Sequence, residues 1–110
     1  MLKRSNLKFK WIDRTLISSF DDFYYFYLVV KHGGFSAASE AENISKSKLS
    51  RRIIDLENKF NVSLIQRTTR HFKVTDLGQE FYEECCKVIT QVECAENVLL
   101  KQKSEPQGLV

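Results

Sequence analysis

The chain is poor in the residues that interrupt regular structure, since its 110 residues include one proline and four glycines. This scarcity of proline and glycine favours long helices over the turn-rich strands of a β-sandwich. The sequence also lacks an apolar run of about eighteen residues, the length that a membrane-spanning helix needs. The basic residues near its start precede no apolar segment of the signal-peptide type, so we expect a cytoplasmic location and no membrane partner.

Cysteine and histidine are also scarce, and their positions suit neither metal binding nor catalysis. Cys85, Cys86 and Cys94 lack metal-ligand spacing, and three cysteines cannot close a disulfide framework. We interpret them as small buried or half-buried side chains of one helix, with a redox-sensing thiol as the alternative. His32 and His71 accompany no nucleophile or paired carboxylate at catalytic spacing, and there is no glycine-rich phosphate loop. The sequence therefore predicts no enzyme activity, no metal and no cofactor.

The charge of the chain is divided unevenly along its length. Residues 45–73 hold eight bases against two acids, a net charge of +6, and residues 1–19 carry +4. Residues 20–44 and 74–110 carry −3 and −4, so the overall net charge is only +3. A strongly basic middle is typical of a phosphate-binding face, although a solvated face can also be basic.

Apolar residues at helical spacing predict a first helix over residues 20–32, which Gly33 and Gly34 would end. Ser36 is a good N-cap for a second helix that reaches about Glu42. The apolar positions of the first helix are Phe23, Phe26, Tyr27 and Val30.

After a turn at Asn43 and Ile44, Ser45 or Ser47 would cap a third helix that runs to about Lys59. Two helices joined by a short turn, here about 35–54, form the helix-turn-helix pattern. The apolar positions of the third helix, Leu49, Ile53, Leu56 and Phe60, mark one face. The opposite face offers Lys46, Ser47, Ser50 and Arg51, with Lys48 and Arg52 near the edge. These polar side chains suit guanine edges or phosphates.

The apolar pair 64–65 and the alternating apolar and polar residues 72–74 predict a two-stranded wing. The residues between them carry Arg67 and Arg70, which gives the wing a positive tip suited to the DNA backbone or minor groove. The fold class is therefore mainly α: a winged helix-turn-helix over residues 20–74.

A long helix follows over residues 75–103, capped by Thr75, and residues 104–110 form a tail. Its apolar residues recur every 3.5 positions, which is typical of a coiled-coil seam and predicts a homodimer. The alternative is a helix that folds back on its own domain. The seam consists of Phe81, Cys85, Val88, Val92, Ala95 and Leu99.

Several separated motifs resemble the N-terminal domain of LysR-type transcriptional regulators over about residues 20–100. They are FSAA at 35–38, ISKSKLSRRI at 44–53, LE at 56–57, LIQRTTR at 64–70 and VTDLG at 74–78. Their agreement in spacing makes the resemblance specific.

The resemblance implies a bacterial regulator that reads a partly palindromic site in double-stranded DNA and dimerises through the long linker helix. In a full-length form it implies a higher oligomer as well. It places Ser36 at a phosphate and Arg67 and Arg70 at the backbone or minor groove. Base-contacting or groove-entering positions fall on Lys46, Ser47, Ser50 and Arg51.

The chain departs from the family pattern at three positions: Glu42 replaces a core leucine, Lys48 a small residue or proline, and Thr69 a frequent glycine. The basic extension 1–19 has no family counterpart. Family members continue into an effector-binding domain about where this sequence stops, so it is either a fragment or a short form. A different class of function, a protein interaction module that uses the long helix, stays as the alternative to specific DNA binding.

Overall fold

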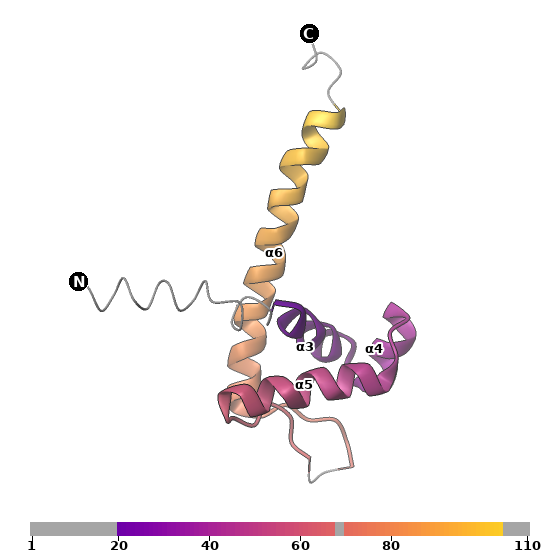
Figure 1. The fold of residues 1–110 in the computed structure, drawn as a ribbon, viewed down its shortest axis with the longest axis vertical. Coiled ribbons are helices and arrows are strands. Elements are labelled where there is room, and N and C mark those ends of the chain that lie inside the picture. The colour runs from indigo at the N-terminus through magenta and orange to yellow at the C-terminus, as the bar shows by residue number, and fades with distance from the viewer. Residues whose placement is uncertain (1–19, 68–69, 105–110) are drawn as a thin grey trace, which may run out of the picture.

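The computed structural model describes residues 20–67 and 70–104, and these residues form a mainly α-helical fold. Figure 1 shows the last helix extending away from a body that the other helices form. No helix in the described part of the chain is long and apolar enough to cross a membrane. The helices are α3 (Phe20–His32), α4 (Phe35–Glu42), α5 (Lys46–Phe60) and α6 (Asp76–Ser104).

Helix α3 is the central element, because it contacts each of the other three helices. Its predicted bounds are confirmed, and Phe26 of the predicted stripe is fully buried. The other three stripe residues are half-buried, and Val29, which the stripe did not include, is fully buried. Gly33 ends the helix with a positive φ of 83°, a conformation that side chains with a Cβ rarely adopt. The core that α3 organises also contains Ala38, Leu49, Ile53, Leu56, Leu64, Ile65 and Cys85.

The start of α4 differs from the prediction, and the start of α5 agrees with it. Gly34 occupies the N-cap position of α4 without a side-chain hydrogen bond, so Ser36 lies within the first turn and is not the cap. At α5 the Ser45 hydroxyl accepts a hydrogen bond from the Lys48 N–H at 3.1 Å. Ser45, and not Ser47, is therefore the N-cap. Asn43 makes the turn in the left-handed conformation, as predicted.

The wing differs from the sequence prediction, because the described residues form one antiparallel bridge in place of two strands. The bridge joins Ile65 to Val74, and the Gln66 N–H donates to the Lys73 carbonyl at 2.8 Å. The N–H groups of Leu64 and Ile65 donate to the Glu57 carboxylate and not to a facing strand. A side chain therefore takes the place of further strand pairing.

Helix α6 begins at a cap that also binds it to the wing. The Thr75 hydroxyl accepts the Gly78 N–H at 2.9 Å and donates to the Ser63 carbonyl 2.8 Å away. A Cβ at Gly78 would collide with the Leu64 carbonyl oxygen and the Val74 side chain. The sequence needs glycine here for close packing of helix and wing.

The two halves of α6 have different surroundings. Phe81 packs against Phe23 and Phe26 of α3, with ring centroids 5.2 and 5.1 Å apart, and Cys85 is only 1% exposed. The apolar residues at the far end of the helix are exposed, and Leu99 is 71% exposed. The predicted seam is therefore divided: its first two positions, Phe81 and Cys85, belong to the core of their own chain.

The structure favours the structural interpretation of Cys85 over a redox-sensing thiol. Burial, with smaller contributions from Cys86 and Glu84, raises the pKa of the Cys85 thiol to about 12. A thiol with this pKa stays protonated at neutral pH, and the thiolate is the reactive form. Cys86 is half-buried and Cys94 is exposed, and none of the three forms a disulfide.

Candidate nucleic-acid interface

The N-terminal ends of α4 and α5 and the wing surround one groove of about 510 Å³. Its lining brings together four residues that the sequence predicts to bind DNA and that lie in three separate segments: Ser36, Lys46, Arg67 and Arg70. Near α4 the groove is lined by the small residues Gly33, Gly34 and Ala37. We refer to this concavity as the polar groove.

The first turns of α5 present their predicted polar face outward. Lys46, Ser47 and Arg51 are exposed and Ser50 is half-buried. Leu49, Ile53 and Leu56 point to the opposite side and are buried against α3 and α4. The separation follows from helical geometry, because buried positions recur every three or four residues and leave the other face free.

Arg52, which the sequence places near the edge of the DNA-binding face, contacts α3 in the folded chain. Its Nε lies 2.8 Å from Oδ1 of Asp22 on α3, and its guanidinium lies over the Tyr25 ring. The contact is an ion pair without the alignment of a hydrogen bond. Burial raises the pKa of the Asp22 carboxyl, and Arg52 opposes that shift. Arg52 therefore attaches α5 to α3, and this role needs no DNA.

Lys48 adds a second cation above the same ring. Its Nζ lies 5.6 Å from the centroid of Tyr25, and the side chain is exposed. Cation–π contacts at exposed sites contribute about 0.5–1 kcal/mol. Lys48 thus remains near the edge of the polar face of α5, where the sequence places it.

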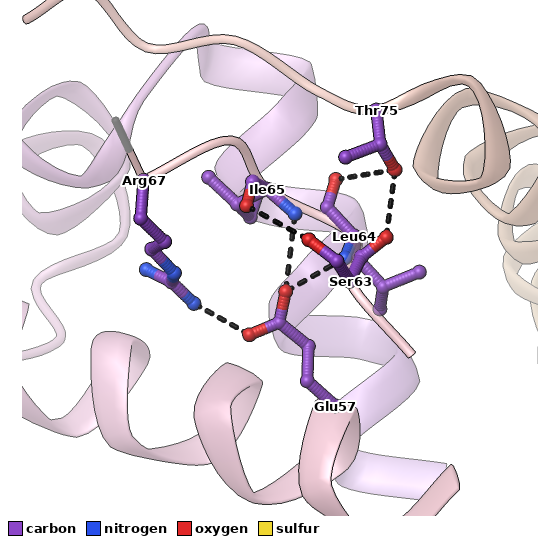
Figure 2. A network of polar contacts seen from close by, with 6 residues as sticks. All are labelled: Glu57, Ser63, Leu64, Ile65, Arg67 and Thr75. Carbon is purple, nitrogen blue, oxygen red and sulfur yellow. Dashed lines mark hydrogen bonds and ion pairs between the residues drawn. The ribbon is translucent and has the colours of Figure 1, made fainter. Parts of the chain in front are cut away.

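Glu57 positions the wing, and sequence reasoning missed it. Its Oε2 accepts the Leu64 and Ile65 N–H groups at 2.7 and 3.1 Å, and its Oε1 accepts from Arg67 Nη2 at 2.7 Å (Figure 2). Figure 2 shows the carboxylate between the α5 backbone and the first wing residues. The available signal was that Glu57 is one of only two acids in the basic segment of residues 45–73. Arg67 remains 41% exposed despite its ion pair.

Aromatic packing fixes the other side of the wing against α4. The rings of Phe35 and Phe72 meet edge to face with centroids 5.9 Å apart, and Gly34 lies beside Phe72. Arg70 is exposed beyond this contact. The wing is therefore held at both ends, by Glu57 and by Phe35, with its cations facing the polar groove.

Glu42, which stands where a core leucine is usual, does not enter the core. Its Oε2 lies 2.9 Å from Nε2 of His32 at the end of α3, and both side chains are partly exposed. The polar pair thus holds α4 to α3 at the surface. Among the described residues, no group of three His, Cys, Asp or Glu side chains is arranged to hold a metal ion.

The remaining dimerisation candidates lie along α6 beyond the core. Val88 and Val92 are half-buried, and Ala95 and Leu99 are exposed. These four positions keep the 3.5-residue spacing of the predicted seam. They form an apolar strip on the part of α6 that leaves the body in Figure 1.

Comparison with protein families gives one match over most of the described chain. Residues 20–79 match the model of bacterial regulatory helix-turn-helix proteins of the lysR family. An HTH-type transcriptional regulator of Xanthomonas campestris pv. campestris is 32% identical over 83 residues, which are 76% of this chain and 24% of that protein. DmlR of Escherichia coli, also an HTH-type transcriptional regulator, is 33% identical over 90 residues, 82% of this chain and 29% of that protein. The chain thus spans about a quarter of the length of these relatives.

Solved structures show the same fold. The BenM DNA-binding domain in complex with the catB site 1 DNA has a TM-score of 0.71 at 28% identity, covering 78% of this chain and 96% of that one. Full-length AphB, a Vibrio cholerae virulence activator, has a TM-score of 0.64 at 29% identity, covering 72% of this chain and 27% of that one. Sequence motifs, helix arrangement and family model agree, so this chain belongs to the LysR family of bacterial transcriptional regulators.

Proposed function

We propose that this chain binds double-stranded DNA sequence-specifically, with α5 in the major groove and the wing on the backbone or minor groove. The observation that carries the proposal is the convergence of Ser36, Lys46, Arg67 and Arg70 on one polar groove beside the exposed face of α5. A phosphate backbone requires such a convergence of cations and helix N-termini. The similarity to the BenM DNA-binding domain, which was solved in complex with DNA, supports DNA binding by this chain.

The residues divide into two groups by what they reach. Polar side chains on the outward face of the first two turns of α5 contact base edges, where Arg51 suits guanine and the short serines permit close approach. Ser36 and the wing cations contact phosphates, which fixes the register of the helix without reading sequence. The base-reading group is Lys46, Ser47, Ser50 and Arg51, with Lys48 at its edge.

The protein acts as a homodimer through the apolar strip of α6. A single winged domain covers few base pairs, and two copies related by a twofold axis double the contacts on a partly palindromic promoter site. The strip consists of Val88, Val92, Ala95 and Leu99, and Leu99 would otherwise expose most of its surface to water. In a longer form of the protein, the dimers associate further and regulate transcription in the bacterial cytoplasm.

The test is binding to a sequence selected from a random DNA pool, compared with a scrambled duplex of equal length and composition. We expect tighter binding to the selected duplex, and the difference should persist as salt weakens binding to both. Equal affinity for both duplexes at every salt concentration would contradict specific recognition. Absence of DNA binding by a dimeric protein would instead favour an interaction module that uses α6.

A further inference from the structure

We propose that the basic segment of residues 1–19 binds within its own chain to an acidic groove between α3 and α6. This groove has a volume of about 280 Å³ and lies beside the body, apart from the polar groove. Its lining consists of Phe20, Tyr24, Ile89, Val92, Glu93 and Glu96. The inference concerns an intramolecular contact and stands independently of DNA binding.

The acidic groove combines an apolar floor with a negative rim. Phe20 and Tyr24 of α3 face Ile89 of α6 across it, while Glu93 and Glu96 supply carboxylates on exposed positions of α6. Neither glutamate forms a salt bridge with another described residue. A ligand with aromatic or aliphatic side chains and positive charge would satisfy both features.

Residues 1–19 have this composition. They carry five basic residues against one acid, a net charge of +4, whereas residues 74–110 carry −4. Leu7, Phe9 and Trp11 alternate with Lys8 and Lys10. In an extended segment such alternation places the apolar side chains on one side, and the long lysine stems can reach a carboxylate rim.

The chain connection makes the contact intramolecular. Residue 19 is bonded to Phe20, which itself lines the acidic groove. Trp11 lies nine positions before Phe20, within a reach of about 30 Å for an extended chain. A tether this short gives a high effective concentration, so a weak interaction suffices.

The acidic groove and the apolar strip occupy neighbouring faces of α6. Because successive residues turn by about 100°, the centre of the groove residues is rotated by about 80° from the centre of the strip. Val92 lies at the common edge. Binding of residues 1–19 therefore leaves Val88, Ala95 and Leu99 free for a second copy.

The experiment uses the fluorescence of Trp11, the single tryptophan of the chain. We expect a blue-shifted emission and protection from acrylamide in the complete protein, compared with a free peptide of residues 1–19. The double variant Glu93→Lys/Glu96→Lys reverses two charges of the acidic groove. It should lower the ratio of groove-bound to free residues 1–19 about fivefold, because each ion pair contributes roughly 0.5 kcal/mol. Added salt should act in the same direction.

A matched control reverses two charges on another face of α6, in Glu80→Lys/Glu83→Lys, and should leave Trp11 protected. Circular dichroism checks that both variants remain folded. Equal quenching of Trp11 in the wild-type protein and in the free peptide would overturn the proposal. An equal effect of both charge reversals on Trp11 quenching would also overturn it. The same holds if the protection of Trp11 rises with protein concentration together with the molecular mass, or if it appears only when DNA is added.

Discussion

Helices α5 and α6 both divide into a part that the core uses and a part that it leaves at the surface. On α5 the remaining surface is a polar, cationic face along the helix, formed by residues such as Lys46 and Arg51. On α6 it is an apolar end that includes Leu99. A cationic face is stable in water without a partner, whereas an apolar one is stabilised by covering it. The two helices therefore indicate two kinds of partner, a polyanion for α5 and an apolar surface for α6.

The largest expected difference lies within α6, between Cys85 in its first half and Cys94 in its second. We expect a thiol reagent to modify Cys94 rapidly at mildly alkaline pH, and Cys85 at least about a thousandfold more slowly, because Cys85 reacts only after opening of the fold. Mass spectrometry of peptides from the labelled protein measures both rates. Similar rates would show that the first half of α6 is detached from the body.

Cys85 also predicts the sign of a pH effect on stability. Its pKa is raised from 9.0 to about 12 by burial, so the folded chain retains a proton that the unfolded chain releases. The stability from this group is fully present below pH 9.0 and declines as pH rises toward about 12. A Cys85→Ala variant should lose less stability than wild type over that alkaline range in urea unfolding.

The next prediction tests the apolar end of α6. Leu99→Asp places a carboxylate in the proposed interface of each copy and should cost about 2–4 kcal/mol of dimerisation. Sedimentation equilibrium should show wild type near twice 12.9 kDa and the variant near 12.9 kDa. Val98→Asp is the matched control, since Val98 is 67% exposed but lies off the strip. A dimer that survives Leu99→Asp and not Val98→Asp would place the interface on another face.

Local signals in the sequence specified most of the fold. The bounds of α3, the turn at Asn43, and the caps at Ser45 and Thr75 all depend on neighbours in the chain, and the structure confirms them. The wrong prediction of Ser36 as the N-cap of α4 also concerns only the first turn of that helix. Gly34 occupies the N-cap position, and the helix begins at Phe35. Capping hydrogen bonds between near neighbours and the helical spacing of apolar residues can both be predicted directly from a sequence.

The missed features depend on pairs in different elements, at least seven positions apart in the sequence. Arg52 pairs with Asp22, which lies thirty positions earlier in the sequence, and no residue near Arg52 predicts that partner. Glu57 takes the N–H groups of Leu64 and Ile65, so the expected strands shrink to a bridge. The repeat of α6 predicted an apolar face correctly but not its division, because Phe81 faces α3 only in the folded chain.

Two neighbouring arginines test the cationic face of α5. Arg51→Ala should lose about 1–3 kcal/mol of affinity for the selected duplex and reduce its preference over the scrambled one. Arg52→Ala should lower the stability of the fold, because buried Asp22 loses its cation, and should leave the preference unchanged. Fluorescence anisotropy titrations with both duplexes give the preference, and urea unfolding gives the stability. The reverse pattern would assign base reading to Arg52.

The smallest expected effect concerns the wing, where Arg67 and Arg70 differ in their protein contacts. Arg70→Ala should weaken binding to both duplexes alike and reduce the slope of log affinity against log salt by about one, the loss of one phosphate contact. Arg67→Ala should produce a smaller change in slope, because Glu57 already neutralises part of its charge, together with a loss of stability at the start of the wing. A change in slope that is larger for Arg67 than for Arg70 would mean that DNA displaces Glu57 from Arg67, and Glu57→Gln would then increase the affinity for both duplexes.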